Sequence, residues 1–107
     1  MKNNLDNYTK DLIINSFELD SVDGISEREL EQMLANRVAF LLANQLEFFF
    51  ATMYRMDVSE PKIHEALSAQ DEQPSLIIAR LIIQRQKEKQ ASRMKYRSES
   101  DFFDDSF

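Results

Sequence analysis

The single histidine, His64, is the residue in this chain best suited to metal binding or acid–base chemistry, because the chain has no cysteine. It follows Glu60 by four residues, a spacing at which two side chains share one face of a helix. A zinc site needs further His or Cys ligands, and a general base needs a nucleophile or a polarising group beside it. We therefore interpret His64 as a surface residue, and expect no catalytic residue, no metal site and no cofactor.

Glu47 is the carboxylate that we expect to be most nearly buried, because three phenylalanines follow it directly. Buried acids can be catalytic, but they also occur in structural ion pairs, and Arg37, Arg55 or Arg80 could supply the partner. Di-iron helical bundles use a Glu-x-x-His motif twice, and this sequence contains none. The carboxylates therefore favour a protein that is not an enzyme.

A basic segment covers residues 80–97, which contain seven bases and one acid. The residues that could contact phosphates are Arg85, Lys89, Arg93 and Arg97. Against this, the bases are spread around the predicted helix, and cations near a helix C-terminus are favourable for the helix dipole alone. The chain as a whole has a net charge of -6. Nucleic-acid binding through this segment, modulated by the acidic residues that follow it, is therefore the alternative interpretation and not the leading one.

The acidic segment 98–107 carries four acids and no base, and its composition predicts a disordered tail. Residues 101–107 resemble the acidic, Phe-ended tip of bacterial single-stranded-DNA-binding proteins, although that family has Pro where this chain has Ser106. The resemblance implies docking into a basic, apolar pocket of a protein partner, whereas the rest of the chain is unlike that family's β-barrel. The predicted docking residues are Phe102, Phe103, Asp104, Asp105 and Phe107. A solubilising tail, or one that folds back on the bases, is the other interpretation.

The elements that would position these residues are predicted to be helices, because one Gly and two Pro leave few turns. A weak helix is expected over 5–16. Ser26 and Glu29 form the pattern of a capping box, and they predict a helix from there to about Met56. Ser59, followed by Pro61, predicts the start of a short helix. The last helix is expected from Pro74 to about Tyr96.

These elements predict an all-α fold, a helical hairpin or small bundle. The long central helix packs antiparallel on the C-terminal helix, with the short connecting helix at the turn. We divide the chain into a weak N-terminal helix with an irregular acidic segment (1–25), a helical core domain (26–97) and the disordered acidic-aromatic tail (98–107).

The long helix is predicted to be apolar on two sides. The first stripe consists of Val38, Leu42, Leu46, Phe49, Met53 and Met56, and the second of Leu30, Leu34, Leu41 and Phe48. One apolar face is enough for a helix at the surface of a domain, and soluble monomers rarely expose large apolar patches. We therefore expect the second stripe to pair two subunits in a homodimer or to bind another partner.

The longest unbroken apolar run, Val38–Ala43, is far shorter than the roughly 20 residues that span a bilayer. The N-terminus has no apolar segment typical of a secretion signal. We expect a cytoplasmic protein without membrane association. The sequence thus favours a non-enzymatic protein–protein interaction or regulatory module, homodimeric and with the tail as a candidate docking segment for a protein partner.

Overall fold

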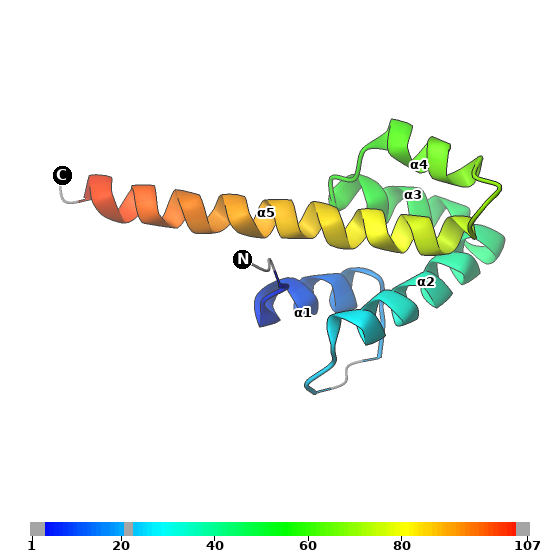
Figure 1. The fold of residues 1–107 in the computed structure, drawn as a ribbon, viewed down its shortest axis with the longest axis horizontal. Coiled ribbons are helices and arrows are strands. Elements are labelled where there is room, and N and C mark those ends of the chain that lie inside the picture. The colour runs from blue at the N-terminus through cyan, green and yellow to red at the C-terminus, as the bar shows by residue number, and fades with distance from the viewer. Residues whose placement is uncertain (1–3, 21–22, 105–107) are drawn as a thin grey trace.

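A computed structural model describes residues 4–20 and 23–104, with side chains up to residue 96, and within these residues it contains helices and no strand (Figure 1). The prediction of an all-α fold is confirmed. The helices of the described residues are α1 (Asn7–Ser16), α2 (Glu27–Asn44), α3 (Leu46–Arg55), α4 (Glu60–Leu67) and α5 (Pro74–Asp104).

Helix α1 begins at an N-cap, Asp6, whose carboxylate accepts a hydrogen bond of 2.8 Å from the backbone N–H of Thr9. This bond satisfies one of the N–H groups that the first turn leaves without a helical partner. Ile13 and Phe17 have no exposed surface, and they belong to the same apolar core as the residues of α2 and α5. The described part of the N-terminal segment is thus an integral part of the core.

Helix α2 begins at the predicted capping box. The Ser26 hydroxyl accepts from the backbone N–H of Glu29 at 3.1 Å, and the Glu29 carboxylate accepts from the backbone N–H of Ser26 at 3.0 Å. The two bonds together satisfy two otherwise unpaired N–H groups.

The predicted continuous helix from Ser26 to Met56 is wrong, because the chain leaves the helical conformation at Gln45 (φ -142°, ψ 63°). The Asn44 amide donates to the carbonyl of Phe40 at 3.0 Å. Such a side-chain bond competes with the backbone ladder at its end. The break lets α3 turn away from the direction of α2 (Figure 1).

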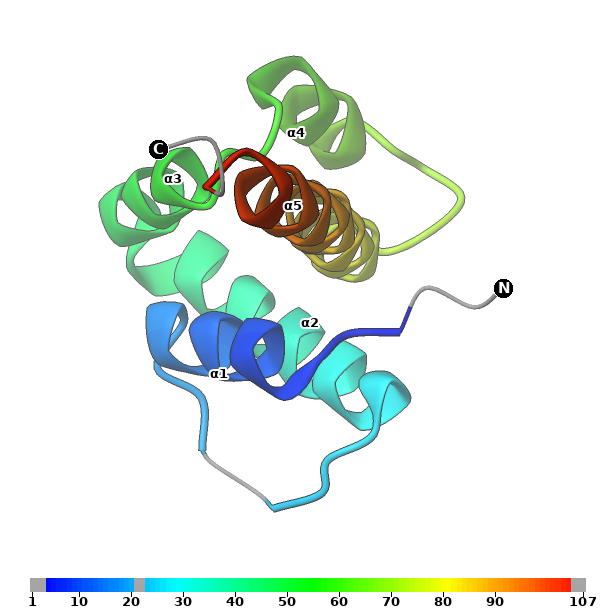
Figure 2. The ribbon, with the colours of Figure 1, turned by 90° about the vertical axis from the view of Figure 1, so that its left-hand side faces the viewer.

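The core lies between α2 and the first half of α5, which form the largest helix–helix interface. They run antiparallel, as predicted (Figure 1). In the end-on view α5 lies between α2 and α4, and α1 sits beside α2 (Figure 2). The side chains without any exposed surface in this interface are Leu30, Leu34, Val38 and Leu41 from α2 and Ile78, Ala79 and Ile82 from α5.

The short connecting helix α4 also follows the prediction. Ser59 occupies its N-cap position, although its side chain makes no capping bond, and Pro61 lies in the first turn. Val58 and Ile63 are both buried, as expected for a hydrophobic staple. On the inner face of α4 Ala66 is buried, whereas the following Leu67 is 36% exposed.

Helix α5 continues past its predicted end near Tyr96, to Asp104. Helix α5 thus includes residues 98–104 of the predicted tail, of which residues 105–107 lie outside the described chain. A helix of 31 residues is about 46 Å long, close to the 52 Å length of the whole molecule. Its C-terminal part projects past all the other helices (Figure 1).

Candidate functional site

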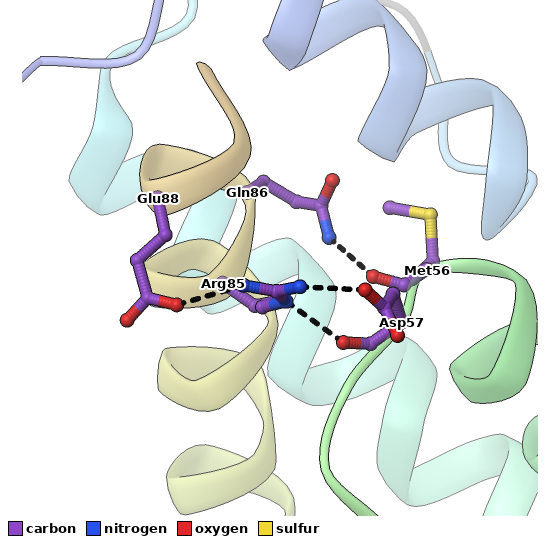
Figure 3. Close-up of polar contacts among 5 residues, drawn as sticks. All are labelled: Met56, Asp57, Arg85, Gln86 and Glu88. Carbon is purple, nitrogen blue, oxygen red and sulfur yellow. Dashed lines mark hydrogen bonds and ion pairs between the residues drawn. The ribbon is translucent and has the colours of Figure 1, made fainter. Parts of the chain in front are cut away.

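The most elaborate polar cluster of the molecule joins α5 to the end of α3 (Figure 3). Arg85 donates its Nε to the backbone carbonyl of Asp57 at 2.9 Å and its Nη2 to the Asp57 carboxylate at 2.5 Å. Its Nη1 donates to Glu88 at 3.1 Å. The next residue, Gln86, is buried, and its amide donates to the carbonyl of Met56 at 2.9 Å. Two neighbouring residues of α5 thus bind two consecutive carbonyls at the C-terminus of α3.

These contacts hold a strained turn. Asp57 has a φ of 60°, a left-handed conformation that is uncommon for residues other than Gly. The N–H of Val58 bonds to the carbonyl of Met53, and the N–H of Asp57 bonds to that of Tyr54. This is the pattern of a Schellman motif, which usually has Gly at the left-handed position. The hydrogen bond and charge of Arg85 lower the pKa of the Asp57 carboxyl.

A second arginine binds the end of α1 in the same way. Glu18 has a φ of 57°, and the N–H of Leu19 bonds to the carbonyl of Ile14. Arg37 of α2 donates to the carbonyl of Phe17 at 2.9 Å and to the Glu18 carboxylate at 3.3 Å. Because the same arrangement closes two helix ends, we interpret the Asp57–Arg85 cluster as a structural clasp.

A pocket of about 300 Å³ lies over this clasp. Its polar lining is Asp57, Ser59, Lys62, Gln84, Arg85 and Glu88. The guanidinium is already bound by two carboxylates, and the Asp57 and Glu88 oxygens accept from it. A reaction would need a free base beside a nucleophile, so this arrangement of mutually paired charges favours no reaction class.

The two candidate chemical residues of the sequence are both on the surface. His64 contacts Glu60 at 3.5 Å, with side chains that are 61% and 76% exposed. Glu47 is exposed, contrary to the expectation that it would be partly buried. Among the described residues, no group of three or more acidic or histidine side chains could hold a metal ion.

Three bases of the basic segment of α5, Arg80, Arg85 and Lys87, contact acids of the same chain. Arg80 contacts Glu72 at 2.8 Å and lies 3.7 Å from Glu31. Lys87 contacts Glu27 at 2.7 Å. Of the four predicted phosphate contacts, Arg85 is in the clasp, Arg93 donates to the Thr9 hydroxyl at 2.8 Å, Lys89 lies within electrostatic range of Asp57, and the Arg97 side chain lies outside the described residues.

The predicted subunit interface is corrected by the structure. Leu30, Leu34 and Leu41 have no exposed surface in the single chain, and Phe48 is half-buried against the same core. Helices α1 and α5, which contact or flank α2, supply the cover that the sequence led us to expect from a second subunit. The predicted docking residues of the tail (Phe102, Phe103, Asp104, Asp105 and Phe107) have side chains outside the described residues.

Exposed apolar side chains occur at several places among the described residues, and one group lies where α5 leaves the other helices. Met94 is 60% exposed and Tyr96 is 70% exposed. Tyr8 of α1, 65% exposed, lies under the guanidinium of Arg93, which is 5.1 Å from the centre of its ring. A hollow of about 520 Å³ is lined by Asp6, Tyr8, Gln90, Arg93 and Met94. The sequence signal for this surface was weak, because Met94 and Tyr96 stand among bases.

Comparison with known proteins finds no matching family model, no matching curated protein and no matching solved structure. No helix of the described residues is both long enough and apolar enough to span a membrane.

Proposed function

We propose that this protein is a non-enzymatic interaction module that presents the projecting part of α5, residues 91–104, to a protein partner. The observation that carries the proposal is geometric: this part of α5 extends past the remaining helices (Figure 1) and begins with the exposed side chains of Met94 and Tyr96.

The anchoring of α5 supports this proposal. Ile78, Ile82 and Gln86 are fully buried on one side of the helix, so its first half is held rigidly in the core. An isolated helix as short as the projecting part, residues 91–104, is marginally stable in water. A helix that continues from an anchored half avoids part of the ordering cost that a free peptide bears on binding. Presenting one preformed helix to a groove is a common mode of protein recognition.

The pairing of the bases argues for a protein partner over a nucleic acid. Arg80, Arg85 and Lys87 each contact a carboxylate of the same chain. A phosphate would have to compete with these acids, and phosphate contacts supply most of the affinity of nucleic-acid binders. Among the described residues of the basic segment, Arg93 binds the Thr9 hydroxyl and not a carboxylate, and Lys95 is exposed.

Site-specific photocrosslinking in the native host tests the proposal. A photoreactive amino acid at position 96 should give a defined protein adduct, because that side chain stands on the projecting part of α5. The matched control places the same amino acid at Glu65, an exposed position of α4. Absence of an adduct from position 96, or the same adduct from position 65, would contradict the proposal that this surface binds a partner. A binding titration with nucleic acid at low salt tests the alternative.

A further inference from the structure

We infer that the partner contributes an acidic segment, and that this segment binds along one face of α5 between Lys89 and Tyr96. The inference rests on the proposed function and specifies the chemistry of the partner. It is carried by a surface hollow whose described lining is basic at one end, in a chain with a net charge of -6.

The hollow has a volume of about 320 Å³ and follows one face of α5. It is lined by Arg85, Glu88, Lys89, Ser92, Arg93 and Tyr96. These positions recur at steps of three or four residues, so they share one side of the helix. From Lys89 to Tyr96 this face is about 10 Å long at 1.5 Å per residue. That length accommodates about three residues of an extended peptide segment.

The two ends of the hollow differ in charge. At one end the Arg85 guanidinium is already bound by the carboxylates of Asp57 and Glu88. From residue 89 onward the described lining contains two bases, Lys89 and Arg93, and no acid. Lys89 also lies within electrostatic range of Asp57, whose charge the bound arginine offsets. An incoming carboxylate is therefore attracted to the end that begins at Lys89.

Arg93 is held in place before a partner binds. Its Nη2 donates to the hydroxyl of the fully buried Thr9 at 2.8 Å, and the guanidinium lies over the Tyr8 ring. A guanidinium has five N–H groups, and the bond to Thr9 uses one of them. Fixing the side chain in advance reduces the entropy lost on binding a carboxylate. Arg93 also lines the neighbouring hollow, which includes Asp6, so an acid is favoured on the Lys89 side.

Tyr96 indicates that the acidic segment also carries an apolar side chain. The tyrosine is 70% exposed and forms the far end of the same face. Aromatic side chains are enriched in protein–protein interfaces, where they bury a large area. A segment in which acids flank an aromatic or aliphatic side chain therefore matches both the bases and the ring of this face.

The small extent of the basic surface favours a peptide over a nucleic acid. Contacts with several phosphates supply most of the affinity of nucleic-acid binders, and this end of the hollow offers two bases. A nucleic-acid strand would continue beyond the hollow, over a chain whose net charge is -6. An acidic peptide segment can end where the bases end.

Mapping the crosslinked adduct tests the chemistry of the partner directly. Mass spectrometry of the digested adduct formed from position 96 identifies the partner segment that lies on this face. The residues that flank the crosslinked position should contain a clear excess of acids over bases. A neutral or basic segment overturns the inference, but leaves the proposed function standing because a protein still binds there.

Charge reversal at Lys89 tests the contribution of the basic end. A labelled synthetic peptide with the mapped sequence is titrated with the full chain, and fluorescence anisotropy measures the dissociation constant. Lys89→Glu should weaken binding about fivefold at low salt, as expected when one exposed ion pair becomes a repulsion. Lys89→Gln should cause a smaller loss. Circular dichroism checks that both variants keep their helical content.

Arg28→Glu is the matched control, because Arg28 is an exposed base of α2 outside the lining of the hollow. It changes the net charge by the same amount as Lys89→Glu and should leave the dissociation constant close to the wild-type value. Equal losses in the two variants, or wild-type binding that does not weaken as salt is added, overturn the inference.

A single-stranded oligonucleotide tests the other class of partner. If it binds the full chain more tightly than the peptide does, and Lys89→Glu weakens that binding, the face belongs to a nucleic acid and the inference is overturned. Absence of any protein adduct from position 96 removes both the inference and the proposed function.

Discussion

The two halves of α5 have opposite characters on the side that faces the other helices. In the first half, Ile78, Ala79, Ile82 and Ile83 are buried against the core. Further along the helix the same side carries Gln86, Gln90 and Arg93, which bind carbonyl and hydroxyl groups of other elements. One helix is thus held by apolar burial at one end and by directed polar contacts further along.

The apolar contacts of α5 stabilise its attachment to the core more strongly than the polar contacts further along the helix do. Burial of a large aliphatic side chain contributes about 1.5–3 kcal/mol, whereas a hydrogen bond contributes about 0.5–1.5 kcal/mol net. Gln90 illustrates the second kind of contact: it donates to the carbonyl of Asn4 at 2.8 Å and accepts from the N–H of Asp6 at 2.9 Å. Gln90 and Arg93 position the N-terminal segment, and beyond these two residues α5 is free of the core.

The largest expected effect on the free energy of unfolding comes from a substitution in the apolar first half of α5. Ile82→Ala should lower the free energy of unfolding by about 2–5 kcal/mol, because it leaves a cavity at a fully buried position. The matched change in the projecting part, Met94→Ala, removes a side chain that is 60% exposed. The free energy of unfolding of this variant should stay within about 0.5 kcal/mol of the wild-type value. Urea denaturation measures both, and equal losses would show that the two halves do not differ as described.

An intermediate effect on the free energy of unfolding is expected from Gln90, one of the polar residues of α5 that contact other elements. Gln90→Ala should lower the free energy of unfolding by about 1–2 kcal/mol, because it removes both partly buried bonds to the N-terminal segment. It should also speed hydrogen exchange at the Asp6 amide. The control is Gln84→Ala at an exposed position. If that variant loses as much stability, helix propensity and not the tether explains the result.

The smallest effect concerns pH. The Arg85 guanidinium holds the pKa of Asp57 in the folded chain below its ordinary value of 3.8. Stability from this contact is therefore complete above that value, and is lost as the pH falls through the lower folded-state pKa. Asp57→Asn should flatten the acid limb of a plot of stability against pH below about pH 4. Asp71→Asn, in the exposed connection before α5, is the control; a flattening of the same size there would contradict the role of the clasp.

Local signals in the sequence located most helix ends correctly. Ser26 with Glu29, Ser59 with Pro61, and Pro74 each act on backbone groups within one turn, so their effect does not depend on distant residues. No Gly or Pro marks the break at Gln45, so the apolar periodicity of the sequence predicted one helix across it. The C-terminal extension of α5 was missed because acidic composition was taken to indicate disorder.

Apolar periodicity identified which residues leave water but not what covers them. Val38 was assigned to one stripe and Leu34 to another, yet both are fully buried in one core. The chain's own helices cover the stripe that the sequence assigned to a second subunit. Leu46, expected inside, is instead 51% exposed just after the break.

The sequence by itself determined the all-α class, the starts of α2, α4 and α5, and the basic and acidic segments, because helix caps and charge depend on neighbours along the chain. Only the tertiary structure decided that Arg85 and Arg37 bind left-handed turns 28 and 19 residues away in sequence. It also decided that the described side chains of α5 beyond Arg93, residues 94–96, are exposed. Such contacts depend on where each helix packs, and packing is a property of the assembled chain.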